Sequence, residues 1–125
     1  MENWLYSKKH IWIEKIGNEA KIGISDYAQE QLGSIMFINL PDVNDKLEVG
    51  AVFGDVESIK TVHDLISPLK GEVLEINESV IDDPSLINES PYKGWLIRVA
   101  VDEVDSTVMT YEKYIEYKES LWHLI

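Results

Sequence analysis

The chain contains no cysteine, which excludes disulfide cross-links and thiolate metal sites. It also has no stretch approaching the ~18 uninterrupted apolar residues that a membrane helix needs. Its first residues, Met1-Glu2-Asn3-Trp4, lack the basic start and apolar region of a signal peptide and the arginine-rich character of a transit peptide. We therefore expect a cytoplasmic bacterial protein without membrane attachment, or a mitochondrial matrix protein only if a transit peptide has been removed.

Basic residues are scarce relative to acidic ones. Eleven lysines and arginines against 23 aspartates and glutamates give a formal net charge of −12. Such a surface repels phosphate backbones, so we expect no nucleic-acid partner. Two interpretations of the excess acids stay open: they confer solubility, or they steer the protein toward basic surfaces on protein partners.

Recognisable catalytic and metal-binding patterns are absent too. The three histidines, His10, His63 and His123, are far apart in the sequence and do not have the spacing of a metal triad. Neither a glycine-rich phosphate loop nor a serine nucleophile elbow occurs. The paired acids at 82–83 and 102–103 lie in turn-like stretches and are interpreted as solvated. We predict no metal site, no catalytic residue and no enzymatic activity of the chain's own.

The 125 residues, 45% of them hydrophobic, suit one domain with a single core over residues 1–125. Alternating apolar residues predict strands at 4–6, 10–16, 20–24, 34–40, 51–59, 61–68, 71–76 and 95–101. Within 51–59, Val52 and Val56 are predicted on one face and Phe53 on the other, with Asp55 and Glu57. The segment 34–40 is apolar on both faces, which predicts a fully buried central strand. The pattern indicates an all-β domain.

Helices are predicted at the periphery. Ser25 or Asp26 caps a short helix that ends at Gly33, and Gln29 has capping-box spacing from Asp26. Asp-Pro at 83–84 predicts one helical turn at 84–87. From residue 110 onward the apolar period becomes helical, which predicts a C-terminal helix docked on the sheets. The docking stripe consists of Tyr111, Tyr114, Ile115, Leu121 and Trp122.

The stretch 50–71 is predicted to form a hairpin with Lys60 at its tip. Glu57 and Asp64 flank this lysine. It is either an ordinary solvated turn residue or an amine presented for modification, since an acylating enzyme must reach the nitrogen and a tight turn holds it outward. Two weakly similar segments, 43–47 and 76–80, lie at nearly equal distances on either side of Lys60 and favour the second interpretation.

Several motifs occur together in one order. Residues 54–60 have the sequence Gly-Asp-Val-Glu-Ser-Ile-Lys, followed by Ser-Pro at 67–68 and Gly-Glu-Val at 71–73. This segment resembles the lipoyl-lysine loop of the glycine cleavage system H-protein family. Residues 22–33 are similar to that family's GITDYAQEQLG segment, residues 36–41 to its VFVELP, and residues 88–97 to its NEDPY…GWL. The resemblance spans the chain from residue 10 to residue 95.

The resemblance implies a barrel-sandwich hybrid fold with lipoate covalently attached to Lys60. A lipoyl arm of this family accepts the aminomethyl group of glycine from glycine decarboxylase and passes it to aminomethyltransferase, and dihydrolipoamide dehydrogenase reoxidises it. The resemblance further implies a lipoate ligase or lipoyl/octanoyl transferase as the attaching enzyme. Glu57, Ser58, Ile59 and Asp64 are the predicted recognition residues around the lysine, and the protein is expected to act as a monomer.

Two positions depart from the family pattern. Residues 10–12 are His-Ile-Trp where the family has His-Glu-Trp, and Asn39 replaces the usual acid. The family's glutamate is a candidate for holding the loaded arm, and isoleucine cannot accept a hydrogen bond from an amine. An alternative therefore stays open, in which the protein stores lipoyl groups and donates them to 2-oxoacid dehydrogenases.

Two further alternatives are disfavoured. Biotin-carrier loops resemble Met-Lys-Met around the lysine, whereas here Lys60 stands between isoleucine and threonine. An enzyme that forms a Schiff base needs a buried lysine with a lowered pKa, whereas a hairpin tip predicts an exposed one.

Overall fold

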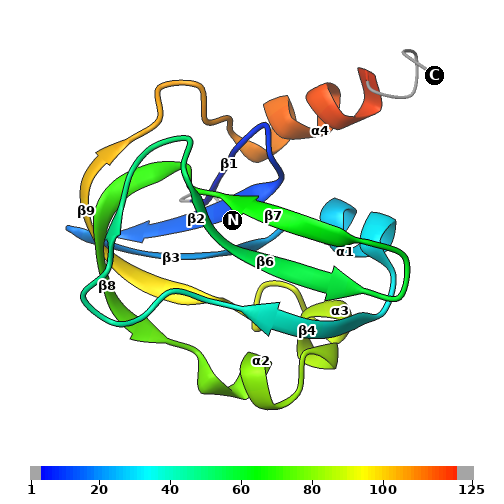
Figure 1. Cartoon of the computed structure of the whole chain (residues 1–125). Coiled ribbons are helices and arrows are strands. Elements are labelled where there is room, and N and C mark those ends of the chain that lie inside the picture. Colours follow the sequence, from blue (N-terminus) through cyan, green and yellow to red (C-terminus); the bar gives the residue numbers. More distant parts are fainter. Residues whose placement is uncertain (1–3, 121–125) are drawn as a thin grey trace.

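The computed structural model describes residues 4–120, which form two antiparallel sheets with short helices around them (Figure 1). The strands are β1 (Trp4–Tyr6), β2 (Ile11–Ile16), β3 (Glu19–Ile24), β4 (Ile35–Asn39), β5 (Lys46–Leu47), β6 (Val52–Ser58), β7 (Val62–Ile66), β8 (Leu69–Ile76) and β9 (Ile97–Val104). The helices are α1 (Asp26–Leu32), α2 (Glu78–Asp82), α3 (Ser85–Glu89) and α4 (Tyr111–Ser120). The predicted all-β fold, a barrel-sandwich hybrid with short peripheral helices including a C-terminal one, is confirmed.

The larger sheet has the strand order β1-β2-β3-β9-β8-β5, and the smaller one has the order β4-β6-β7. The main core lies between them, where the inward-facing side chains of both sheets meet. Alternation places Ile11 and Ile13 of β2, and Ile22 and Ile24 of β3, in this core. Fully burying one such side chain contributes about 1.5–3 kcal/mol, so this pattern explains why the two sheets pack face to face.

Of the two predicted caps of α1, Ser25 is the N-cap: its side-chain oxygen accepts a hydrogen bond from the Ala28 backbone amide at 3.2 Å. It ends at Gly33, whose positive φ of 75° is suited to glycine. The predicted capping box between Asp26 and Gln29 is wrong. Ser25 serves as the cap, and the Gln29 side-chain nitrogen Nε2 donates to the Asp26 carboxylate at 2.9 Å.

The prediction that 34–40 forms a fully buried central strand is wrong. Strand β4 pairs only with β6 and lies at an edge of the smaller sheet. A bulge between Ile35 and Phe37 turns two consecutive side chains outward, and Met36 is 51% and Phe37 62% exposed. The apolar run therefore covers both faces of an edge strand, of which only one faces the core.

The predicted alternation in 51–59 is also wrong in part. The pairing of β6 with β7 shifts between Val52 and Gly54, so Phe53 is an extra residue in the strand. Phe53 and Val56 are both buried, and Val52 is exposed. After this bulge the inward-facing side chains fall at positions that a strict period of two does not predict.

Several boundaries differ from the predictions. Strand β5 and helix α2 were not predicted, and β9 runs over Ile97–Val104 and not over 95–101. The predicted turn at 84–87 is α3, and the Asp83 carboxylate accepts the Ser85 amide at 3.3 Å. The two similar segments around Lys60 adopt different structures: 43–47 forms a turn and β5, whereas 76–80 ends β8 and begins α2.

Helix α4 packs on β1 through Tyr114, whose ring stacks on Tyr6 at 4.7 Å between centroids. Tyr114 is buried, whereas Tyr111 is 41% exposed. The predicted docking of the C-terminal helix is thus confirmed through Tyr114. Leu121 and Trp122 of that stripe, and His123, lie outside the described residues.

Candidate functional site

Strands β6 and β7 form a hairpin that reaches toward α1, with Lys60 in its turn (Figure 1). The Ser58 amide donates to the Thr61 carbonyl at 2.8 Å and closes the turn. The Ser58 hydroxyl oxygen also accepts the amides of Lys60 and Thr61, at 3.2 Å each. Ser58, predicted as a recognition residue, is therefore used by the structure to shape the tip that exposes Lys60.

The tip rests on the end of α1. The Ile59 amide donates to the Ser34 carbonyl at 3.1 Å. The Lys60 side chain extends over Gly33: a Cβ placed on that glycine would lie 3.4 Å from Lys60 Cε and 3.8 Å from Nζ. Lys60 is exposed, but its stem lies against the protein surface. A glycine at this position leaves the amine room for an attached group.

Asn88 of α3, which the sequence analysis missed as a site residue, fixes the backbone under the lysine. Its amide nitrogen donates to the Gly33 carbonyl at 2.9 Å and to the Gln29 side chain at 3.0 Å. Its carbonyl oxygen accepts the Ile35 amide at 2.9 Å. The only signal in the sequence was its place in the motif at 88–97, which gave no hint that it reaches residues more than 50 positions away.

Glu57 and Asp64 lie on the same outward face of the smaller sheet. Glu57 is paired with Val62 of β7, and Asp64 is paired with Asp55 of β6. On the neighbouring strand β4, the side-chain nitrogen of Asn39 donates to the Asp55 carboxylate at 2.7 Å. An acid at position 39 would lack this hydrogen bond and repel Asp55, so asparagine is well suited to this row. The predicted acids thus lie in the hairpin strands themselves, and neither forms an ion pair with Lys60.

A cleft of about 300 Å³ opens beside the hairpin, between α1 and β7. It is lined by His10, Tyr27, Ala28, Gln31, Leu32, Thr61 and His63. Thr61 is the neighbour of Lys60 in the chain, so the cleft begins next to the exposed amine. Burial, together with the charges of His63 and Lys9, lowers the pKa of His10 to about 4, and this imidazole is neutral at pH 7.

Ile11, where the family pattern has glutamate, lies in the main core and pairs with Ile24 of β3. It does not line the cleft. A group bound in the cleft therefore has no contact with the side chain at position 11, and isoleucine could not accept a hydrogen bond from it.

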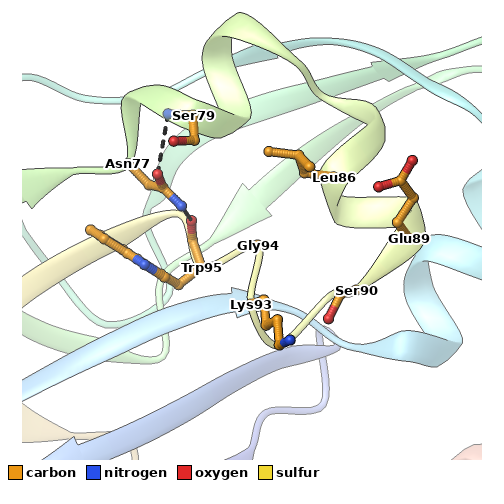
Figure 2. A pocket seen from close by; sticks show the side chains of 8 residues that line it. All are labelled: Asn77, Ser79, Leu86, Glu89, Ser90, Lys93, Gly94 and Trp95. Carbon is orange, nitrogen blue, oxygen red and sulfur yellow. Dashed lines mark hydrogen bonds between the residues drawn. The ribbon is translucent and has the colours of Figure 1, made fainter.

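A second cleft, of about 420 Å³, is lined by the start of α2, by α3 and by the segment 90–95 (Figure 2). Asn77 is held by two hydrogen bonds there: its side-chain nitrogen donates to the Trp95 carbonyl at 2.8 Å and its side-chain oxygen accepts the Ser79 backbone amide at 3.2 Å. The other lining residues are Leu86, Glu89, Ser90, Lys93 and Gly94. None of the predicted site residues borders this cleft.

Between residues 4 and 120, no group of three or more histidine, aspartate or glutamate side chains is arranged to hold a metal ion. Within the same range, no helix is both long and apolar enough to cross a membrane.

The two-sheet fold is that of the lipoyl and biotinyl carrier class, and comparisons with known proteins specify the family. The model of the glycine cleavage H-protein family matches residues 4–121. The chain therefore belongs to the glycine cleavage H-protein family.

Individual relatives agree with this assignment. The chain is 45% identical over 115 residues to a glycine cleavage system H protein of Herpetosiphon aurantiacus, covering 89% of each chain. It is 46% identical over 114 residues to one of Staphylococcus saprophyticus, covering 89% of this chain and 90% of the relative. The crystal structure of a Mycobacterium marinum glycine cleavage system H protein is similar at a TM-score of 0.90 with 34% identity, over 95% of this chain and 98% of that one.

Proposed function

We propose that the protein is a lipoyl carrier of the glycine cleavage system and that Lys60 holds the lipoyl group in amide linkage. The observation that carries this proposal is the exposed Lys60 in a closed turn, in a chain of this family. Attached lipoate supplies a disulfide that becomes a dithiol and carries a group between enzymes. Tethering raises the effective concentration of that group at each partner.

The residues around Lys60 fit such a group. Gly33 leaves space beside Nζ, and the adjoining cleft combines apolar Ala28 and Leu32 with polar Thr61 and His10. An arm with an aliphatic stem and a polarizable sulfur end suits a cleft of this mixed character. The chain's own contribution is to present the amine and to shelter the arm, so we propose no catalysis by the protein itself.

The proposed partners are glycine decarboxylase, aminomethyltransferase, dihydrolipoamide dehydrogenase and the lipoate-attaching enzyme, each met by a monomeric carrier. Both curated relatives bear the name of the glycine cleavage system. This favours glycine cleavage over the alternative, donation of lipoyl groups to 2-oxoacid dehydrogenases. A location in the bacterial cytoplasm belongs to the same proposal and rests on the bacterial origin of these relatives.

Glu57 and Asp64 are the proposed recognition acids for the attaching enzyme, with Ile59 as an exposed apolar contact at the tip. We expect Glu57→Lys to lower the kcat/KM of lipoylation by about tenfold, the effect of losing one charged contact. Glu48→Lys is the matched control, because Glu48 is an exposed glutamate outside the hairpin strands. Equal rates for the two variants would remove Glu57 from the recognition surface.

The carrier role is tested by combining the lipoylated protein with glycine decarboxylase, glycine and labelled bicarbonate. We expect exchange of label into the glycine carboxyl group with lipoylated wild type and none with unmodified protein. In parallel, the lipoylated protein is offered to a lipoyl transferase with an unmodified 2-oxoacid dehydrogenase domain. Transfer without carboxyl exchange would contradict the glycine cleavage assignment and support the relay.

A further inference from the structure

A chain of hydrogen bonds runs from the start of α1 to the cleft beside Lys60. The Ser25 hydroxyl oxygen accepts the Ala28 amide at 3.2 Å and lies 2.7 Å from the Tyr114 hydroxyl oxygen. The Tyr114 hydroxyl oxygen in turn lies 2.8 Å from Nδ1 of His10. Ser25 is 1% and Tyr114 2% exposed. The hydroxyl hydrogens of both residues must therefore find acceptors within the protein.

Only one direction of proton donation satisfies every group in this chain. If His10 Nδ1–H donates to Tyr114, then Tyr114 donates to Ser25, which already accepts from Ala28. The Ser25 hydrogen then has no acceptor among residues 4–120. A buried unpaired hydroxyl hydrogen is unfavourable. In the opposite direction Ser25 donates to Tyr114 and Tyr114 donates to Nδ1, and no donor is left without a partner.

This direction fixes the protonation of His10. Because Nδ1 accepts, the neutral ring carries its hydrogen on Nε2. No hydrogen bond to Nε2 exists in the described part of the chain, where no buried side-chain nitrogen lacks a partner. His10 lines the cleft beside Lys60, and we infer that Nε2 faces this open space. The ring presents an N–H donor there.

The surroundings of His10 keep it neutral. The titratable and charged groups near the ring are Lys9, Tyr27 of α1, His63 of β7, and Tyr114 and Tyr117 of α4. Protonation would make Nδ1 a donor and reverse the chain, leaving the Ser25 hydrogen unpaired. This agrees with the lowered pKa of His10, which is about 4. Burial is the largest cause of this lowering, and the charges of His63 and Lys9 add to it.

Helix α1 connects His10 with Lys60. The Ser25 amide donates to the His10 carbonyl at one end of the helix, and Gly33 lies under Lys60 at the other. Eight residues at about 1.5 Å each make this path about 12 Å long. A lipoyl group places its nearer sulfur seven bonds from Nζ, or about 9 Å when extended. These lengths are comparable, so the sulfur end of an arm lying along α1 comes near His10.

We propose that His10 donates its Nε2–H to a sulfur of the lipoyl arm and favours the thiolate when the arm is reduced, with Tyr114 as the residue that positions this donor. The inference rests on lipoyl attachment at Lys60, as proposed above. A thiolate accepts a hydrogen bond more strongly than a neutral sulfur, so a fixed donor favours the ionised form. A donor cannot accept a hydrogen bond from an amine, so His10 does not replace the glutamate that the family has at position 11.

The first test uses the unmodified protein and measures the imidazole tautomers by nitrogen-15 NMR at neutral pH. We expect the hydrogen of His10 on Nε2. Tyr114→Phe keeps the ring but removes the donor to Nδ1, and it should give a mixture of tautomers. Tyr117→Phe, a control from the same helix, should leave the tautomer unchanged. A hydrogen on Nδ1 in the wild type would overturn the proposal without any variant.

The second test uses the lipoylated protein after reduction and follows thiol alkylation as a function of pH. We expect His10→Asn to raise the lower of the two thiol pKa values by about one unit, with no change in Tyr117→Phe. Asparagine tolerates the positive φ of 69° at this position. Equal thiol pKa values in wild type and His10→Asn would refute this inference alone. Failure of lipoylation, seen by intact mass, would refute the lipoyl assignment and this inference with it.

Discussion

At the residue scale, Gly54 shows how closely β4 and β6 approach. A Cβ at this position would lie 2.2 Å from the carbonyl oxygen of Asn39. We predict that Gly54→Ala lowers the free energy of unfolding by about 1–3 kcal/mol, the usual cost of overpacking. Urea unfolding measures this loss. The backbone of β4 must move to accommodate the methyl group, and this strand edge supports the lysine hairpin.

Gly50→Ala is the comparison for this prediction. A Cβ there meets nothing within 4 Å, although the φ of 83° is unfavourable for alanine. Its expected cost is about 1 kcal/mol, from backbone conformation alone. A Gly50→Ala loss equal to or larger than that of Gly54→Ala would contradict the close approach of the two strands.

His10 makes the stability of the fold depend on pH. Its pKa is about 4 in the folded protein and about 6.5 in an unfolded chain. Between these values the unfolded state binds more protons, so stability falls as the pH decreases from about 6.5 toward 4. Above about pH 6.5, His10 is neutral in both the folded and the unfolded state, so it no longer makes the free energy of unfolding depend on pH.

We predict that His10→Asn flattens this part of the pH profile, because asparagine does not titrate. The free energy of unfolding of both proteins, measured in urea at about pH 7 and about pH 5, checks the prediction. Parallel profiles for wild type and variant would show that His10 is not the responsible group.

At the element scale, α4 depends on one anchoring side chain. Tyr114 stacks on Tyr6 and is almost completely buried, whereas Tyr111 is 41% exposed. We predict that Tyr114→Ala lowers the free energy of unfolding by about 3–5 kcal/mol, as for other buried aromatic residues. Tyr111→Ala should cost about 1 kcal/mol or less. Similar losses for the two variants would contradict docking through Tyr114.

The comparison of sequence with structure is also clearest for single elements. The period of two located β2 and β3, because each has one face in the main core. The opposite face is not simply exposed, since Trp12 and Gly23 are buried there under a second aromatic cluster. The same rule failed at β4 and β6, where bulges at Met36 and Phe53 change which side chains point inward. Bulges depend on contacts between strands, such as the approach of Gly54 to Asn39. A single segment of sequence does not contain that information.

The candidate site was also predictable only where it depends on residues close together in the sequence. The position of Lys60 in a turn follows from the local pattern, and the hydrogen bonds of Ser58 close that turn. The roles of Asn88 and Tyr114 were not predictable, since each acts on residues more than 50 positions away along the chain. Neither residue has a local motif that indicates its long-range partner.

At the scale of the whole molecule, the net charge of −12 is the dominant feature. Its ion pairs are few for the number of acids: Arg98 bridges Glu19 and Glu75, and Lys46 bonds Glu72, among residues 4–120. Most acids are therefore unneutralised and produce a negative field around the protein. Such a field accelerates encounter with basic surfaces and is screened by salt.

We predict that the kcat/KM of a lipoate ligase for this protein falls several-fold between about 0.05 M and 0.5 M salt, with kcat little changed. Steady-state kinetics at increasing salt measure this effect. A control with free lipoate and ATP alone separates the effect of salt on the enzyme from its effect on encounter. A kcat/KM independent of salt would show that the acids do not steer this partner.

The most direct measurement is the intact mass of the wild type and of Lys60→Arg after incubation with lipoate ligase, lipoate and ATP. Arginine keeps the positive charge and the exposed position, but it is not a substrate for acylation. We predict one lipoyl increment in the wild type and none in the variant. An increment in Lys60→Arg, or none in either protein, would contradict the assignment of Lys60 as the carrier lysine.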